Sequence, residues 1–284
     1  MECRGGYPGL KGLEAMPAVA VVAVVEAVWG WSVRVPGASV GGGSLPLPPP
    51  TTVIGSLAYS LARLLGWPET LYETDTVGVA AYSSARRLAS AVLSASAGLL
   101  EGRVVTAYDV VRTVNIPFIR PENRRDTSQW LSVNAFGVTI APRARLCMAI
   151  VFDGERLESL GINESLLEKA AWSISRLGSK EGLVSVVEAG VFRAERGAGP
   201  TRLYGRRGVL QGEHIVALRA WSPWSDESWM GLQRRGAELL ELEAPLRITG
   251  PVYEPTPEPP VAIEGWRVEA SGLLGECGTI PVLA

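Results

Sequence analysis

The stretch with the clearest chemical potential runs from residue 44 to residue 66 and reads SLPLPPPTTVIGSLAYSLARLLG. Its three consecutive prolines force an extended approach, because each ring fixes φ and restricts the residue before it. We expect Thr51 or Thr52 to cap a helix over residues 53–65. A helix N-terminus with two hydroxyls and Gly55 nearby can seat a phosphate. A motif that only packs the helix onto a sheet would show the same pattern.

Arginines gather in two segments, although the formal net charge is only −2. Five lie between residues 103 and 125, and five more lie between residues 193 and 207 with Tyr204 among them. Arginines beside aromatic side chains suit phosphate contact and base stacking. The acidic residues are concentrated later, from Glu238 to Glu276, and a solvated, salt-bridged surface is therefore the alternative interpretation.

The segment WSPWSDESW is an unusual loop that carries Trp221, Trp224 and Trp229. These side chains either pack on the protein's own core or form an apolar surface for a partner. The sequence favours neither interpretation.

The sequence offers little for catalysis. His214 is the only histidine, which excludes a histidine-based metal cluster and leaves one candidate general base of that type. The glycines at 41–43 match neither a P-loop nor a dinucleotide fingerprint. We expect no metal and no cofactor.

The three cysteines lie far apart in the sequence, a spacing that fits neither a disulfide framework nor a zinc site. We therefore expect a reducing, cytoplasmic setting, with Cys147 as a small core residue. The apolar run AVAVVAVVEAVW at 18–29 is too short to span a bilayer, and its valines favour a buried strand. Only three of the 27 basic residues are lysines, a bias that suits a thermophile.

The patterns predict an α+β chain in the order strand, helix, strand, strand, helix, strand. The expected strands are residues 18–35, 103–111, 136–140, 144–152 and 183–192. The expected helices are residues 53–65, a small-residue helix over 80–100, and residues 163–177, which Asn163 caps. Residues 112–130 are expected to form a long loop or arm. This order is the split βαβ pattern of a ferredoxin-like fold, with an insertion after the first helix.

We expect two regions along the chain. Residues 1–195 would form the ferredoxin-like domain, with an insertion at about 67–135, and residues 196–284 would form a C-terminal β-rich region. The Pro-rich segment PVYEPTPEPP at 251–260 reads as a linker within that second region.

Several of these pieces together resemble one family. A valine-rich first strand, a Gly-rich loop and LPPPTTVIGSLAYSLARLLG are similar to the CRISPR-associated Cas-five family of RAMP proteins, in its archaeal type I-A (Apern) subtype. The stretch RLGSKEGLVSVVEA at 176–189 and GWRVEASG near the C-terminus fit the same family. The resemblance spans nearly the whole chain and is loosest over residues 67–130.

This resemblance implies a ferredoxin-like RAMP fold with a protruding thumb and a small C-terminal β element. It also implies a non-catalytic subunit of a Cascade surveillance complex that binds the 5′ handle of the CRISPR RNA. Its partners would be the first Cas-seven type backbone subunit, whose filament it caps, and the large Cas-eight type subunit. The expected RNA-binding residues are Arg34, Thr51, Thr52, Arg120, Arg124, Arg125, Trp130 and Lys180, and the expected partner-binding residues are Trp221, Trp224 and Trp229.

Two alternatives remain open at this point. The type I-C relatives cut precursor RNA with a Tyr, Lys and His set, and an endoribonuclease here would depend on His214. The other alternative is a protein–protein scaffold that uses the tryptophan loop and makes no RNA contact of its own.

Overall fold

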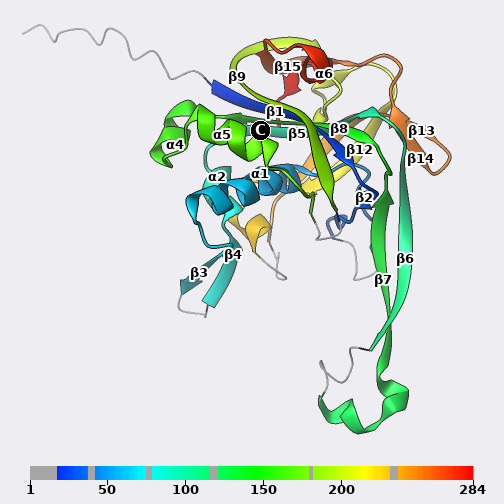
Figure 1. Cartoon of the computed structure of the whole chain (residues 1–284). Helices are drawn as coiled ribbons and strands as arrows, with labels where there is room; N and C mark the ends of the chain where they lie inside the picture. Colours follow the sequence, from blue (N-terminus) through cyan, green and yellow to red (C-terminus); the bar gives the residue numbers. More distant parts are fainter. Residues whose placement is uncertain are drawn as a thin grey trace, which may run out of the picture.

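The computed structural model describes residues 18–37, 42–74, 79–114, 121–178, 182–230 and 236–283. Two antiparallel seven-stranded sheets and a small hairpin account for most of the chain, and few helices cover them (Figure 1). The fold is therefore α+β, as the sequence predicts. The helices are α1 (Pro50–Leu65), α2 (Ala85–Ala89), α4 (Gly154–Ser159), α5 (Glu164–Trp172) and α6 (Gly272–Glu276).

The first sheet has the strand order β11–β15–β9–β1–β8–β5, and β16 pairs with β15. Its strands are β1 (Ala18–Ala27), β5 (Val92–Glu101), β8 (Arg145–Phe152), β9 (Val184–Pro200), β11 (Leu210–Gln211), β15 (Val261–Val268) and β16 (Ile280–Pro281). In chain order, its four central strands β9–β1–β8–β5 are the fourth, first, third and second. Helix α1 lies in the connection from β1 to β5, and α5 lies in the connection from β8 to β9.

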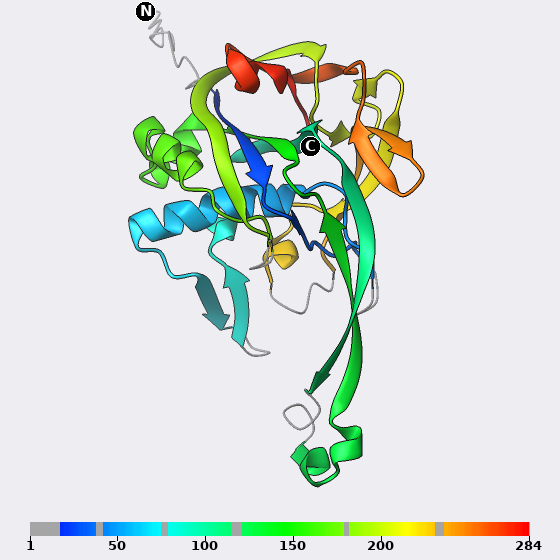
Figure 2. The same ribbon diagram turned by 45° about the vertical axis from the view of Figure 1, so that its right-hand side comes forward.

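The second sheet has the order β10–β13–β14–β6–β7–β2, and β12 pairs with β13. Its strands are β2 (Gly30–Trp31), β6 (Val104–Val114), β7 (Leu131–Ile140), β10 (Gly205–Arg206), β12 (Ile215–Trp221), β13 (Leu239–Thr249) and β14 (Val252–Pro255). The small hairpin consists of β3 (Thr70–Thr74) and β4 (Val79–Ser83). The ribbon β6–β7 and the hairpin β3–β4 both project from the same side of the molecule (Figures 1 and 2).

Strand β1 is buried on both faces, which explains its nearly unbroken apolar run. Val21, Ala23 and Val25 point into the core beneath α1 and α5, whereas Val22 and Val24 point into a second core beneath the C-terminal segment. Successive side chains of a strand alternate between faces, so a strand between two apolar layers has no polar face. Each such valine contributes about 1.5–3 kcal/mol by its burial. The predicted strand 18–35 is shorter than expected, because β1 ends at Ala27 and β2 pairs in the other sheet.

Helix α1 starts earlier than predicted, and its cap is not a threonine. Pro49 is the N-cap residue, Pro50 is the first helical residue, and no side chain caps the helix. Proline fits the first helical position, because its fixed φ is helical and the missing N–H would have no partner there. Thr51 and Thr52 therefore lie inside the first turn. Gly66 ends the helix in the left-handed conformation.

The predicted helix over residues 80–100 is wrong. These residues form β4, the short helix α2 and the strand β5. The small side chains reflect a close approach to β5, not helix propensity: a Cβ on Gly98 would lie 1.8 Å from the carbonyl oxygen of Arg202. The backbone N–H of Tyr204 donates to the carbonyl of Ala97 at 3.1 Å along the same edge.

The helix expected over residues 163–177 is shorter in the structure. The side chain of Asn163 accepts from the backbone N–H of Leu166 at 2.9 Å, which confirms the predicted cap. Helix α5 then ends at Trp172, and the sequence reading missed α4, which Asp153 caps. The predicted linker 251–260 is also corrected in part, because Val252–Pro255 forms strand β14 between β13 and β6.

Cys147 and Cys277 form a disulfide, contrary to the expectation from their spacing. Cys147 lies on β8 and Cys277 follows α6, and both side chains are buried in the second core. The fold brings together residues 130 positions apart, which sequence spacing cannot reveal. The inference of a reducing compartment therefore loses its basis. Among the described residues, no helix has both the length and the apolar character needed to cross a membrane.

We predict that removing this disulfide destabilises the fold. A cross-link that closes a loop of this length stabilises a protein by up to about 5 kcal/mol in the chain-entropy model, and commonly by about 2–4 kcal/mol. The double variant Cys147→Ser, Cys277→Ser should show a lower midpoint in denaturant unfolding than the oxidised protein. Adding dithiothreitol should lower the midpoint of the native chain and leave the double variant unchanged. An equal response of both proteins to dithiothreitol would contradict the disulfide.

Candidate functional site

A groove of about 1250 Å³ runs along one face of helix α1, between the ribbon β6–β7 and the hairpin β3–β4. Its floor is the helix face that extends from Thr51 to Ala62, a length of about 16 Å at 1.5 Å per residue. We call its two walls the Arg34 side and the Trp229 side. The Arg34 side consists of Ser32–Gly37, Phe136, Gly137, Arg176 and Gly178. The Trp229 side consists of Glu69, Thr70, Ala81–Ala85, Trp221 and Ser228–Met230.

The start of α1 is held in place from two directions. The hydroxyl of Tyr204 donates to the carbonyl of Pro48 at 3.0 Å, and Tyr204 is fully buried. Burial raises the pKa of this hydroxyl well above its ordinary value, which keeps it protonated as a donor. On the other side, the indole N–H of Trp31 donates to the carbonyl of Leu45 at 3.2 Å. The proline segment is therefore fixed by the core, and the helix begins at a defined point of the groove.

The glycine loop before α1 packs directly on the base of the ribbon. A Cβ on Gly137 would lie 2.2 Å from the carbonyl carbon of Gly43 and 2.3 Å from the backbone nitrogen of Ser44. The Thr139 hydroxyl lies 2.7 Å from the Ser44 hydroxyl, and the Ser32 hydroxyl donates to the carbonyl of Gly137 at 2.7 Å. These contacts set the position of β7 relative to the start of α1.

The Arg34 side carries two cationic side chains. Arg34 is exposed, and Arg176 lies over the ring of Tyr59 at 4.0 Å from its centroid. A guanidinium stacked on an aromatic ring keeps its N–H groups available for an anion. Within the described part of the chain, neither arginine forms an ion pair with a carboxylate. This side of the groove is therefore electropositive.

Gly55 leaves the helix face open between these two arginines and the first turn. A Cβ built on Gly55 would meet no atom within 4 Å. Thr51 and Thr52 are half-buried on the same face. The floor of the groove at this point is backbone and hydroxyl, which suits the approach of an anion to a helix N-terminus.

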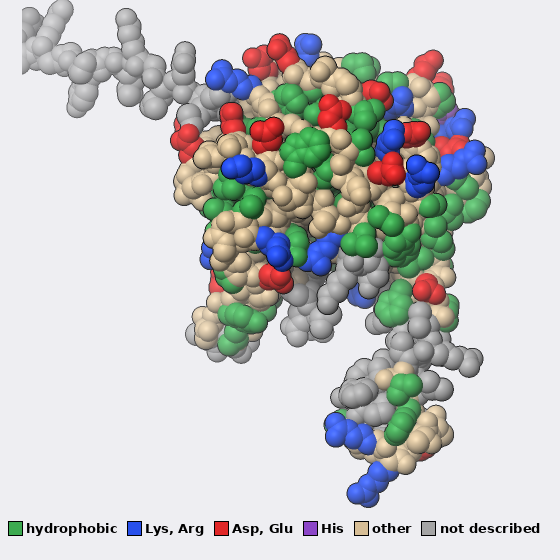
Figure 3. All heavy atoms as spheres, in the orientation of Figure 1, with side chains coloured by type: hydrophobic (Ala, Val, Ile, Leu, Met, Phe, Trp, Pro, Cys, Tyr) green, Lys and Arg blue, Asp and Glu red, His purple; other side chains and the backbone are tan. Residues whose placement is uncertain are grey.

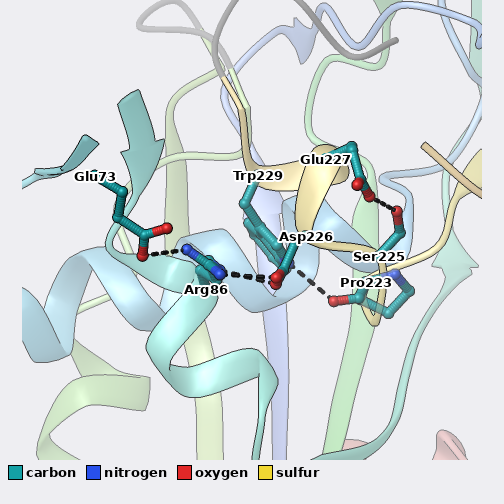
Figure 4. Close-up of polar contacts among 7 residues, drawn as sticks. All are labelled: Glu73, Arg86, Pro223, Ser225, Asp226, Glu227 and Trp229. Carbon is teal, nitrogen blue, oxygen red and sulfur yellow. Dashed lines mark hydrogen bonds and ion pairs between the residues drawn. The ribbon is translucent and has the colours of Figure 1, made fainter. Parts of the chain in front are cut away.

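The Trp229 side is held together by Arg86 (Figure 4). Its guanidinium pairs with Glu73 on β3 at 2.6 Å and with Asp226 at 2.7 Å, and it lies 4.3 Å from the centroid of the Tyr82 ring. The hydrogen bond from Arg86 lowers the pKa of Asp226 below its ordinary value of 3.8. Arg86 therefore joins the β3–β4 hairpin to residues Asp226–Trp229, two segments that line the same groove.

Comparisons with known proteins show which family the chain belongs to. No protein-family model matches the chain. The chain is 34% identical over 180 residues to CRISPR system aCascade subunit Cas5 1 of Saccharolobus solfataricus, which covers 63% of this chain and 68% of that protein. CRISPR-associated protein Cas5 3 of the same organism is 34% identical over 181 residues, with the same coverage. The chain belongs to the Cas5 family.

The Cas5 assignment confirms the resemblance to the Cas-five family drawn from the sequence. The fold is also similar to the crystal structure of a CRISPR protein from Archaeoglobus fulgidus, with a TM-score of 0.54 and 20% identity. That alignment covers 88% of this chain and 96% of the other.

In this Cas5 protein, the predicted RNA-binding residues fall into separate groups. Arg34, Thr51 and Thr52 come together in the groove. Arg124 and Arg125 lie on a short 3₁₀ helix at the end of the ribbon, followed by the half-buried Trp130. Basic side chains are visible at that tip in the space-filling view (Figure 3).

Two predicted residues, Arg120 and Lys180, lie outside the described residues. Gly178 is the last described residue before Lys180. A Cβ on Gly178 would lie 3.8 Å from the Thr52 side chain. The base of the GSKEG loop thus reaches the first turn of α1.

The tryptophan loop of the Cas5 chain packs largely on the protein's own core. Trp229 is only 6% exposed, and its indole N–H donates to the carbonyl of Pro223 at 2.9 Å. The indole N–H of Trp224 donates to the carbonyl of Val92 at 3.0 Å. The prediction of an exposed partner surface is therefore corrected for Trp229, and Trp221 remains half-buried in the groove wall.

The alternative interpretation of the arginine clusters holds for part of the second cluster. Arg207 pairs with Glu241 at 2.8 Å, and Arg206 lies 3.8 Å from Glu264. Tyr204, which lies among these arginines in the sequence, is buried and cannot stack on a base. The acidic C-terminal residues thus serve as partners for these arginines.

His214 lies in the turn between β11 and β12, in a left-handed backbone conformation with φ of 56°. Its side chain is exposed, and it does not line the groove. Over the described residues, no group of three or more His, Cys, Asp or Glu side chains could hold a metal ion.

Sequence reasoning missed Tyr59, Arg176 and Arg86 as residues of the site. Tyr59 lies one helical turn after Gly55 on the same face, a spacing that was visible in the sequence. Arg176 opens the quoted RLGSKEG stretch, but nothing in the sequence indicates that it stacks on Tyr59. The ion pairs of Arg86 span 13 and 140 residues, so only the fold reveals them.

We predict that Arg86→Met lowers the free energy of unfolding by about 1–2 kcal/mol at neutral pH, because it removes two partly exposed ion pairs and a cation–π contact. Since the Asp226 pKa is lowered in the folded state, this contribution is complete above pH 3.8 and is lost as the pH falls below it. Urea unfolding at pH 7 and pH 3 measures the difference. The control is Arg87→Met, which removes only a contact to Trp67 at 5.6 Å. A deficit of Arg86→Met that is equal at both pH values would contradict the ion-pair account.

Proposed function

We propose that this Cas5 protein is a subunit of a type I-A CRISPR surveillance complex and binds the 5′ handle of the CRISPR RNA in the α1 groove. The observation that carries the proposal is the convergence of Arg34, Arg176 and the open helix face at Gly55 on one side of the groove. The related protein of Saccharolobus solfataricus is named as an aCascade subunit, which supports the same placement.

Charge and shape favour a single-stranded nucleic acid as the occupant. The arginines of the Arg34 side lack carboxylate partners among the described residues, so their charge is available to an incoming phosphate. The groove also offers aromatic walls, and single strands bind to basic grooves that contain stacking surfaces. Thr51, Thr52 and the first turn of α1 would hold a phosphate, and Lys180 would add a further contact.

The wider architecture of the proposal follows from the topology. The order β9–β1–β8–β5 with α1 and α5 on one face supports a ferredoxin-like RAMP core. The ribbon β6–β7 would act as the thumb, with Arg120, Arg124, Arg125 and Trp130 tracking the RNA beyond the groove. The Cas-seven type backbone subunit and the Cas-eight type large subunit would be its protein partners in the cytoplasm.

We propose no catalytic role for the protein. A metal-independent ribonuclease would need its base near the RNA, and His214 is on a turn that does not line the groove. The handle would therefore be held intact.

We predict that the full chain binds labelled CRISPR repeat RNA without metal and leaves it uncut, with binding and cleavage read from one gel. The logarithm of the affinity should fall with the logarithm of the salt concentration, by a slope of roughly −0.7 per phosphate contact. Arg34→Ala and Arg176→Ala should each make that slope less steep by roughly 0.7, the value of one phosphate contact. Arg193→Ala, an exposed arginine of β9, is the control. If the native chain cuts the RNA and His214→Ala does not, the protein is a ribonuclease and the proposed non-catalytic role is wrong. If the chain binds no RNA and assembles with its protein partners independently of salt, the protein–protein scaffold is favoured.

We predict opposite effects of Gly55→Glu on the fold and on RNA binding. The substitution should stabilise the helix by up to about 1 kcal/mol, since glycine is a poor helix former. Its carboxylate would repel a phosphate in the groove, and RNA affinity should fall by roughly tenfold or more, which corresponds to about 1.4 kcal/mol. Gly55→Ala is the matched control. It should stabilise the helix about as much as Gly55→Glu does, and it should bind RNA with the affinity of the native chain. Unchanged RNA binding by Gly55→Glu would exclude this helix face as the site.

A further inference from the structure

Strand β3 forms an open edge of the small hairpin β3–β4. It is the outer strand of that hairpin (Figures 1 and 2), and within the described residues its only pairing partner is β4. The backbone of Met230 forms a β-bridge to Tyr82, so a further segment already contacts β4. An uncovered strand edge can pair with an extended segment of another chain.

The backbone hydrogen bonds of the hairpin show which groups of β3 point outward. The backbone N–H of Ser84 donates to the carbonyl of Glu69 at 3.1 Å, and these two residues continue the register of the hairpin by one pair. Hydrogen-bonded and non-hydrogen-bonded pairs alternate along an antiparallel ladder. The N–H and C=O groups of Thr70, Tyr72 and Thr74 therefore point away from β4, towards the open edge.

Strand β3 lacks three of the devices that commonly protect an open edge. It contains neither proline nor lysine, and it pairs with β4 without a bulge. Tyr72 and Val79 are 73% and 67% exposed, and the alternation of side chains places them on the same face of the hairpin. Apolar side chains of an added strand would cover this face.

The opposite face of the hairpin is acidic. Glu73 lies there, and Arg86 pairs with Glu73 at 2.6 Å and with Asp226 at 2.7 Å. One guanidinium thus serves two carboxylates, so this cluster keeps a net negative charge. Glu69, which precedes β3, is exposed and adds a further carboxylate. These side chains disfavour a phosphate backbone and a second copy of β3, and they favour basic side chains on an added strand.

We propose that β3 pairs with an extended strand of a partner protein in which apolar residues alternate with lysine or arginine. Successive side chains of a strand point to opposite faces, so the apolar residues would lie beside Tyr72 and the basic residues beside Glu73. Main-chain hydrogen bonds to Thr70, Tyr72 and Thr74 would supply affinity, and the alternating pattern would supply selectivity. This surface goes beyond the proposed function and does not depend on RNA binding.

The test uses the full-length chain and two labelled synthetic peptides, one that alternates valine with lysine and one that alternates valine with glutamate. Fluorescence anisotropy measures the binding of each peptide, and hydrogen–deuterium exchange measures protection of the β3 amides. The valine–lysine peptide should bind at least about tenfold more tightly than the valine–glutamate peptide, and added salt should weaken its binding. At saturation it should slow amide exchange in residues 70–74 by about tenfold or more.

Tyr72→Pro is the decisive variant, because it removes an outward N–H and leaves the hydrogen bonds between β3 and β4 intact. It should weaken binding of the valine–lysine peptide by about tenfold or more, the effect of losing a main-chain hydrogen bond together with the strand geometry. The matched control Tyr72→Val keeps the N–H and an apolar side chain, and it should retain most of the affinity. Native exchange rates at Tyr82 and Ser84 in both variants would show that the hairpin still forms.

A third peptide tests the pairing without any change to the protein. It is the valine–lysine peptide with methylated backbone nitrogens, which cannot donate main-chain hydrogen bonds and should not bind. Equally tight binding of this peptide, or protection that falls outside residues 70–74, would show that β3 does not pair with an added strand. Equal binding of the lysine and glutamate peptides would rule out the alternating basic strand as the occupant.

The same exchange measurement in the complex with the backbone and large subunits asks whether a partner strand occupies β3. Protection of residues 70–74 that Tyr72→Pro removes would support the inference, and native exchange rates there would overturn it. Self-association of the chain that Tyr72→Pro abolishes would make the occupant a second copy, which also overturns the inference.

Discussion

The groove depends on one close approach of two backbone segments, the loop Gly42–Ser44 and strand β7 at Gly137. A side chain at Gly137 would overlap the loop, since even its Cβ would lie 2.2 Å from Gly43. Because this contact is backbone to backbone, it fixes the distance between the ribbon and the chain that enters α1. The buried hydroxyls of Ser44 and Thr139 then hold the loop in register with β7. This contact, together with the β-bridge between Arg34 and Ser44, positions the Arg34 side of the groove.

The opposite wall depends on a different kind of contact. No residue of strands β3 and β4 is buried, and the hairpin is joined to the Trp229 segment by the ion pairs of Arg86 with Glu73 and Asp226 and by a β-bridge between Tyr82 and Met230. Ion pairs at a partly exposed position are individually weak, so this wall is less firmly held than the one built on backbone packing.

The sequence was sufficient where local chemistry decides the structure. Three features follow from patterns within a few residues: the doubly buried β1, the cap of Asn163 on α5 and the end of α1 at Gly66. Prediction from the sequence failed where contacts with a distant segment of the chain decide the local structure. The small residues of β5 are small because residues 202–204 pack against them, and a helix reading could not foresee that neighbour. The bond between Cys147 and Cys277 and the stack of Arg176 on Tyr59 have the same origin.

Photo-crosslinking of the full chain to repeat RNA that carries 4-thiouridine, followed by mass spectrometry of the linked peptides, tests the central claim most directly. We expect crosslinks to the first turns of α1 around Thr51–Tyr59. Crosslinks that map only to the ribbon tip or to the face covered by α6, with none on α1, would contradict the groove as the RNA site.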